Sequence, residues 1–412
     1  MDLKITNVTL PDRKGNWHVA IANGYISEIS AEPILTKTAE TLEAQGKLLI
    51  PGLVDPHIHL DKALLLERYP AVSGTFSEAM QKTLQAKQEY TLADIQSRAS
   101  KIIEKAIAFG TTSMRTHVEV DPILQLKSLE ALLPLKEKYA WGITLQLAVF
   151  AQEGITNQPG TIDLLRQAMA MGGDAIGSAP YIDPDPVANI RLVFDIAQEF
   201  DCDVDFHLDF LDDDSPLLLP VVIEETLKHN WHNRVCLGHM TKLAGLTTAE
   251  LKAFIPQLKE AGIAILALPA TDLYMMGRED THDVRRGVAP IDRLAESGVK
   301  VGLATNNVQN LFTPFGDGDV LKICTLLAQV LQLGTTASHQ LCLEMATLKA
   351  AEAIGISDYG IAVGKVADLV LLDANSVSEA IAIAPIDRTT IKRGSIVAQS
   401  KSSLNFKGNI KS

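Results

Sequence analysis

The sequence predicts an α/β protein built on a (β/α)8 barrel, with a small β-sandwich domain made from both ends of the chain. In the middle, eight short apolar segments alternate with helical patterns over about 310 residues. The first and last fifty residues contain only short strand-like segments. A third observation favours a closed barrel over an open doubly wound sheet, namely that histidines stand at the ends of predicted strands.

The composition indicates a globular chain and excludes several classes of partner. Of 412 residues, 47% are hydrophobic and 21% are charged, which is typical of a protein with a sizeable core. The net charge of −13 disfavours nucleic acids and anionic membranes, and suits a small neutral or cationic substrate. Four scattered cysteines and the absence of a long apolar stretch predict a soluble, cytoplasmic protein with reduced thiols.

The two ends of the chain are too short to bury separate cores. Near the start, strand-like segments cover 3–10, 17–21 and 25–29, and near the end they cover 367–372 and 389–398. We therefore predict one small domain from residues 1–50 and 362–412, with the barrel, residues 51–361, inserted between its halves.

The barrel prediction depends on eight apolar segments. They are 48–54, 111–117, 143–150, 174–178, 204–207, 234–239, 263–268 and 300–304. Helical patterns separate them, for example at 91–109, 163–171, 187–200 and 248–261. This alternation alone would also suit an open sheet.

Four histidines follow or end these segments. His57 and His59 lie two residues apart after the first strand, so both can face one ion. His207 ends the fifth strand and His239 the sixth. Because the carboxyl ends of barrel strands meet at one face, the four imidazoles should converge there. Such a cluster suits Zn²⁺ or Fe²⁺, whereas a single histidine at a strand end is more often a satisfied polar group.

Several motifs resemble one known family. The first strand carries PGLVDPHIHLD at 51–61. Further matches are RTHV at 115–118, QEG at 152–154, the segment 273–287, TPFG at 313–316 and DYGIA at 358–362. Together they resemble the amidohydrolase superfamily, and in particular bacterial cytosine deaminases and triazine-degrading N-isopropylammelide amidohydrolases. The resemblance covers nearly the whole chain.

The resemblance implies a metal-dependent deaminase or amidohydrolase that cleaves a non-peptide C–N bond of a small nitrogen heterocycle. His57, His59 and His207 would bind one divalent ion, zinc or iron, and His239 would hold or polarise the attacking water. Gln152 would read the amide-like edge of the substrate. Segment 174–178 has no lysine that could bridge a second ion. Members of the family commonly assemble, so a homo-oligomer is compatible with the sequence.

Two positions depart from the family pattern. Asn306 replaces an aspartate that takes the proton from the water, and Phe210, three residues after His207, replaces a general-acid glutamate. Neither side chain is a base near neutral pH. We expect both residues to contact the substrate, with Phe210 adding an apolar wall.

Other residues could carry the proton. Asp209 is the preferred replacement if the strand continues past His207, although a purely structural role is equally compatible with the sequence. His239 is a second candidate base, and Asp272 and Lys62 are weaker ones, with Lys62 more simply interpreted as a residue of the barrel rim or of a helix start. The alternative function is a degenerate barrel that binds a heterocycle without catalysis.

Overall fold

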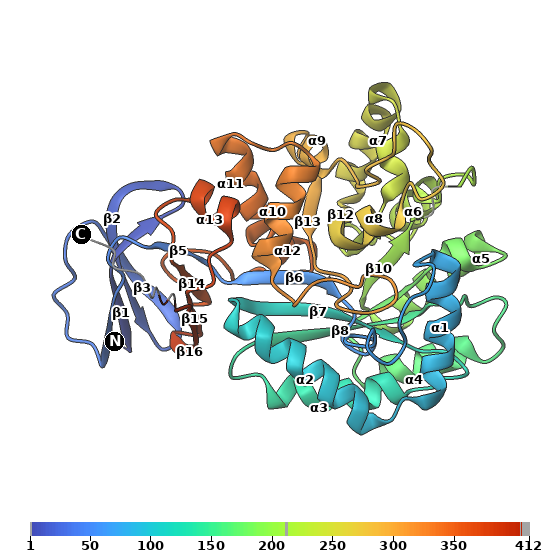
Figure 1. Ribbon diagram of the computed structural model, residues 1–412, viewed down its shortest axis with the longest axis horizontal. Helices are drawn as coiled ribbons and strands as arrows, with labels where there is room; N and C mark the ends of the chain where they lie inside the picture. The colour runs from blue at the N-terminus through green and yellow to red at the C-terminus, as the bar shows by residue number, and fades with distance from the viewer. Residues whose placement is uncertain (1, 211–212, 404, 406–412) are drawn as a thin grey trace.

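The computed structural model describes residues 2–210, 213–403 and 405. Figure 1 shows two parts, a barrel surrounded by helices and a sheet beside it that contains both the beginning and the end of the described chain. None of the helices in the described ranges has the length and apolar character needed to cross a membrane.

The barrel contains eight parallel strands that are neighbours in chain order. They are β6 (Leu53–Ile58), β7 (Thr111–Glu119), β8 (Thr144–Ala151), β9 (Ala175–Ser178), β10 (Asp203–Leu208), β11 (Val235–His239), β12 (Ala264–Ala267) and β13 (Lys300–Leu303). A parallel bridge between Ile58 and Asn306 joins the last strand region to the first. The predicted α/β barrel is therefore confirmed.

The outer helices cover the strands. The predicted ones appear as α2 (Leu92–Ala108), α4 (Thr161–Met171), α5 (Pro186–Phe200) and α7 (Thr248–Ala261). The others are α1 (Phe76–Glu89), α3 (Lys127–Lys138), α6 (Leu219–Lys228), α8 (Pro269–Met275), α9 (Ile291–Glu296), α10 (Val320–Val330), α11 (Thr336–Met345), α12 (Leu348–Ala353) and α13 (Val377–Ile383). The local sequence determines where several of these helices begin. For example, Thr247 and Glu250 form a reciprocal capping box at the N-terminus of α7.

The second part is a mixed sheet with the order β16-β15-β14-β5-β1-β2-β3, and β4 also pairs with β1. Its strands are β1 (Leu3–Leu10), β2 (Arg13–Ala22), β3 (Tyr25–Ser30), β4 (Glu40–Glu43), β5 (Leu48–Pro51), β14 (Leu369–Leu372), β15 (Arg388–Lys392) and β16 (Ser395–Ser400). Because β5 pairs with β14, strands from the two ends of the chain share one sheet, as predicted. The boundaries of the two domains remain a prediction.

The predicted strand 48–54 is in fact two strands that belong to different sheets. The chain leaves β5 and enters β6 at Gly52, whose N–H donates to the Asp368 carbonyl. A side chain at this position would lie 2.2 Å from the Thr112 hydroxyl, so the close approach requires glycine. Apolar periodicity continues across the junction, which is why the sequence pattern does not reveal it.

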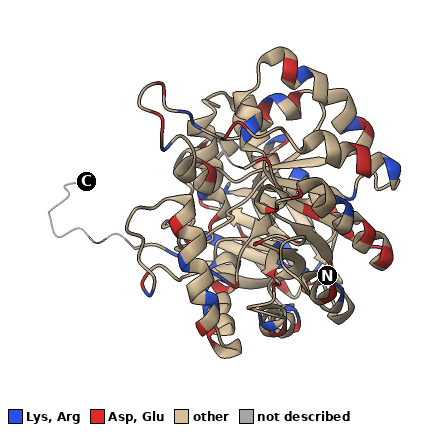
Figure 2. Cartoon of the chain, turned by 90° about the vertical axis from the view of Figure 1, so that its right-hand side faces the viewer, with Lys and Arg blue, Asp and Glu red and all other residues tan. Residues whose placement is uncertain are grey.

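Charged side chains lie mainly outside the barrel. Figure 2 shows acidic and basic residues interspersed over the outer helices and loops. The apolar core occupies the space between strands and helices, and a separate cluster that includes Leu3, Ile21 and Ile391 packs on the terminal sheet. The buried charged groups described below are therefore exceptions that need partners.

Candidate active site

Three imidazoles meet at the carboxyl ends of the barrel strands. His57 and His59 project from the end of β6, and His207 projects from β10. The Nε2 atom of His207 lies 3.1 Å from Nε2 of His57 and 3.0 Å from Nε2 of His59. The predicted convergence of histidines from distant parts of the chain is present in the structure.

This geometry fits a bound cation. Nitrogens bound to one zinc at 2.0–2.1 Å in a tetrahedral arrangement would lie about 3.3 Å apart, close to the separations found here. Burial, reinforced by neighbouring charged or titratable groups, lowers the pKa of His57, His59 and His207 well below its ordinary value. The rings are therefore neutral at physiological pH, which is the form that binds metals.

Asn306 lies next to this cluster. Its backbone N–H donates to the His57 carbonyl and its carbonyl accepts from the His59 N–H, both at 2.9 Å. Its side chain is fully buried, yet neither amide atom has a hydrogen-bond partner among the described residues. An orphaned buried amide is costly, so this side chain is suited to a ligand of the cation or of the substrate.

His239 is held by a carboxylate behind it. His239 Nδ1 lies 2.6 Å from Asp272 Oδ1, and Asp272 Oδ2 accepts the Leu268 N–H. The site also brings together three ring nitrogens, one from each of His57, His207 and His239, which all lie within 4.8 Å of one another. Asp272 thus fixes the tautomer with the proton on Nδ1 and leaves Nε2 of His239 free to accept a proton. Asp272, a weak candidate base in the sequence, is a positioning residue in the structure.

A narrow cavity opens beside the histidines. The described residues that line it are His59, Lys62, Phe76, Gln152, Tyr181, His207, Phe210, His239, Thr271, Asn307 and Phe312. Helix α1, which the sequence did not predict, brings Phe76 to this wall. Aromatic faces with a few polar groups are typical of a site for a small planar ligand.

Gln152 and Phe210 line this cavity, and their role in substrate binding stays a prediction. Gln152 follows the end of β8, and its Oε1 accepts a hydrogen bond of 3.3 Å from Lys62 Nζ. The ring of Phe210 lies 4.2 Å from that of His239, centroid to centroid, and also contacts Phe76. The wall beside His239 is therefore apolar.

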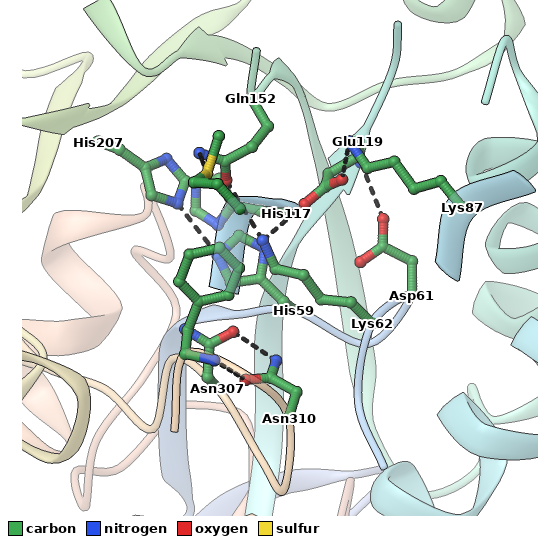
Figure 3. Close-up of polar contacts among 12 residues, drawn as sticks. His59, Asp61, Lys62, Lys87, His117, Glu119, Gln152, His207, Asn307 and Asn310 are labelled. Carbon is green, nitrogen blue, oxygen red and sulfur yellow. Dashed lines mark hydrogen bonds and ion pairs between the residues drawn. The ribbon is translucent and has the colours of Figure 1, made fainter. Parts of the chain in front are cut away.

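Lys62 lies inside the site and not at the barrel rim, so the simpler interpretation of the sequence was wrong. Its ammonium is 2.6 Å from Glu119, and the same carboxylate also pairs with Lys87 at 2.6 Å (Figure 3). Burial alone would raise the pKa of Glu119, but the two ammonium groups hold it at about 2. Lys87 further contacts Asp121 at 2.9 Å and Glu153 at 2.5 Å.

This ionic cluster could hardly be predicted from the sequence. Lys87 is on α1, Glu119 ends β7 and Glu153 follows β8, so the partners are remote in the chain. The only sequence signal was an acidic residue at the end of each of two apolar strands. Burial of these charges is tolerated because each ammonium is paired, and the pairing docks α1 on the barrel.

Asp209 is placed differently from the expected proton carrier. Strand β10 ends at Leu208, and Asp209 has a left-handed backbone with φ +47°, so the strand alternation that would aim its side chain at the site does not continue. Its carboxylate accepts from the N–H groups of Leu218 and Leu219, at 2.9 and 3.2 Å, where α6 begins. It does not line the cavity, which favours the structural role.

We expect Asp209→Ala to lower the free energy of unfolding by about 1 kcal/mol with little change in turnover, because the variant loses a helix cap. Burial raises the pKa of Asp209 to about 6, so ionisation disfavours the folded state. The difference in stability should therefore shrink as the pH rises through that value. Urea denaturation at several pH values, beside steady-state kinetics, tests both points. A large fall in kcat with unchanged stability would restore Asp209 as a proton carrier.

Comparison with known proteins places this site in a family. A model of the amidohydrolase family matches residues 40–398. The structure of 5-methylcytosine deaminase from Klebsiella pneumoniae, liganded with 5-fluorocytosine, superposes with a TM-score of 0.92 and 31% identity, covering 98% of this chain and 99% of that one.

Two curated relatives are similar over most of their lengths. N-isopropylammelide isopropyl amidohydrolase of Pseudomonas sp. (strain ADP) is 29% identical over 409 residues, which are 97% of each chain. Pterin deaminase of Rhizobium rhizogenes (strain K84 / ATCC BAA-868) is 28% identical over 390 residues, 93% of this chain and 88% of the relative. The chain therefore belongs to the amidohydrolase family. As a member, it is a hydrolase of carbon–nitrogen bonds other than peptide bonds, as the sequence predicted.

Proposed function

We propose that this protein hydrolyses a C–N bond of a small nitrogen heterocycle, releasing ammonia or an amine, with one divalent cation as cofactor. The observation that carries the proposal is the meeting of three neutral imidazoles at 3.0–3.1 Å beside an aromatic cavity. The kinds of small ring named for its relatives, cytosine, ammelide and pterin, support it.

His57, His59 and His207 would hold the cation, and the uncharged nitrogen donors suit Zn²⁺ or Fe²⁺. A divalent cation at this position supplies a Lewis acid that lowers the pKa of water towards neutrality. Asn306 is available to it through its unpartnered amide oxygen. No lysine on β9 could bridge a second ion, so we propose a single one.

His239 would move the proton. With Nδ1–H donated to Asp272, its Nε2 accepts a proton from the attacking water and returns it to the departing nitrogen. The water oxygen forms the new bond to the ring carbon as the C–N bond breaks. His239 alone would thus do the work of the two carboxylates in the family pattern, whose positions are occupied here by Asn306 and Phe210.

The other cavity residues would bind and orient the ring. Phe210 and Phe312 provide apolar faces, and Gln152 and Asn307 provide amides. Asn307 is itself held by Asn310, whose Nδ2 donates to Asn307 Oδ1 at 2.7 Å (Figure 3). Side chains held in this way would orient the reacting carbon towards the histidines.

A second candidate function is binding of a heterocycle without catalysis. It is favoured by Asn306 and Phe210, since neither can take or give a proton near neutral pH. General acid–base groups contribute about 10²–10⁴-fold in rate, so their loss is a specific argument for a degenerate site.

One experiment separates the two functions. The purified protein is analysed for metal, and ammonia or amine release is screened with pyrimidines, triazines, pterins and cyclic amides. We expect about one divalent ion per chain, as three histidine ligands imply, and release from at least one ring class. The Asn306→Asp/Phe210→Glu double variant is screened in parallel. An inert parent whose double variant deaminates cytosine would favour the binding function, and a metal-free, inert protein would refute the hydrolase.

A further inference from the structure

The cavity beside the histidines has an unusual balance of charge. Among the described residues that line it, Lys62 contributes one ammonium, and no carboxylate reaches the surface of the cavity. Asn306 and Phe210, beside the histidines, are uncharged. A cation bound by the imidazoles would add to the positive charge of the site.

Two carboxylates behind this wall are already engaged. Glu119 lies between Lys62 and Lys87, at 2.6 Å from each ammonium, so it is shared by two cations. Asp272 is fully buried behind His239 and accepts hydrogen bonds from that ring and from the Leu268 N–H. Neither is free to meet a cationic ligand in the cavity.

Lys62 can also donate one further hydrogen bond to a ligand. Its ammonium can donate three hydrogen bonds, and the structure accounts for two of them, to Glu119 and to Gln152. The nitrogen lies 4.8 Å from the centre of the Phe312 ring, at the cavity wall. Gln152 accepts from Lys62 through its oxygen, and its amide NH2 group faces Tyr181, with a long 4.0 Å contact to the Met80 sulfur. This NH2 group is the part of Gln152 that can donate to a ligand. Both groups therefore offer donors.

We propose that the substrate binds as an anion, a planar heterocycle whose ionised amide edge lies against Lys62 and Gln152. The inference rests on the proposed function and narrows its substrate class. A ring nitrogen and an adjacent exocyclic oxygen that share one negative charge present two acceptors to these donors. Aromatic side chains contact the two faces of the ring. This reverses the expectation from the net charge of −13, because a buried ammonium at the cavity wall acts on a ligand over a shorter distance than the surface carboxylates, which salt screens.

The test compares barbiturate, which is ionised at neutral pH, with uracil, which has nearly the same shape and is uncharged. Isothermal titration calorimetry on the holoenzyme should give a Kd for barbiturate about 10- to 100-fold lower, the value expected for hydrogen bonds to a charged group. Lys62→Met should bring the two Kd values close together, and Lys62→Arg should preserve most of the difference.

Because Lys62→Met also disturbs Glu119, a second pair of variants leaves the ionic cluster intact. Phe210→Glu and Phe210→Gln have similar size and differ in charge. Phe210→Glu should bind barbiturate at least about tenfold more weakly than Phe210→Gln, whereas uracil should bind the two variants alike.

The outcomes separate this inference from the proposed function, since binding is measured without turnover. A holoenzyme that binds uracil as tightly as barbiturate, or binds neither, overturns the inference even if neutral heterocycles are hydrolysed. A protein that prefers the anion but releases no ammonia or amine from any ring contradicts the proposed function alone. Equal weakening of both ligands by Phe210→Glu would show a steric effect and would also overturn the inference.

Discussion

His207→Ala is expected to remove both the bound cation and the turnover. His207 Nε2 lies within 3.1 Å of Nε2 of both His57 and His59, so its loss leaves no closed set of three ligands. A bound cation would stabilise the transition state by several kcal/mol. Without it, kcat/KM should fall by more than about 10³-fold. Metal analysis of the purified variant, together with kinetics on the substrate found by screening, measures both effects.

The matched control is His232→Ala. His232 is exposed and precedes the amino end of β11, whose carboxyl end carries His239, and its Nδ1 lies 3.0 Å from the Glu260 carbonyl. This variant should keep its metal and its rate. If His207→Ala retained stoichiometric metal and normal turnover, the assignment of the metal site would be refuted.

We expect Asp272→Asn to keep the metal but to lower kcat/KM by about 10²–10⁴-fold, the usual contribution of an acid–base group. The Leu268 N–H donates to Asp272 Oδ2, so the new amide must place its oxygen there and turn its NH2 towards His239. The imidazole then has to accept at Nδ1 and carry its proton on Nε2, where it can no longer take one from water.

The contrast with His207→Ala makes this second prediction specific. Both variants lose activity, but only His207→Ala should lose metal. Asp317→Asn, at a half-buried carboxylate that pairs with Lys322, provides a control for the substitution itself. Near-normal turnover of Asp272→Asn would show that His239 is not the group that moves the proton.

The sequence predicted the barrel well because its evidence is local. Each buried strand and each amphipathic helix is recorded in consecutive residues, so β7 to β13 and α2, α4, α5 and α7 were found close to their observed ends. Helix α1 was missed, since it is an insertion whose apolar residues contact the mouth of the cavity. The junction at Gly52 was also missed, because one apolar run continues through both sheets.

The site was predicted unevenly. His57, His59 and His207 stand at strand ends, and the barrel topology alone brings their rings together. Asp209 was expected to face the site on the assumption that β10 continues, but a single residue with φ +47° turns its side chain to the start of α6. Lys62 was assigned to the rim, because its partner Glu119 is 57 residues away and no local pattern links them.

The alternation of strands and helices, the positions of the histidines and the two missing carboxylates follow from residue type and spacing along the chain. Which polar groups face one another across the barrel depends on the folded structure. Those pairings set the His239–Asp272 orientation, the sharing of Glu119 by two ammonium groups and the charge of the cavity. Electrostatic interactions act through space over a few ångströms, so they depend on distances that the order of residues does not contain.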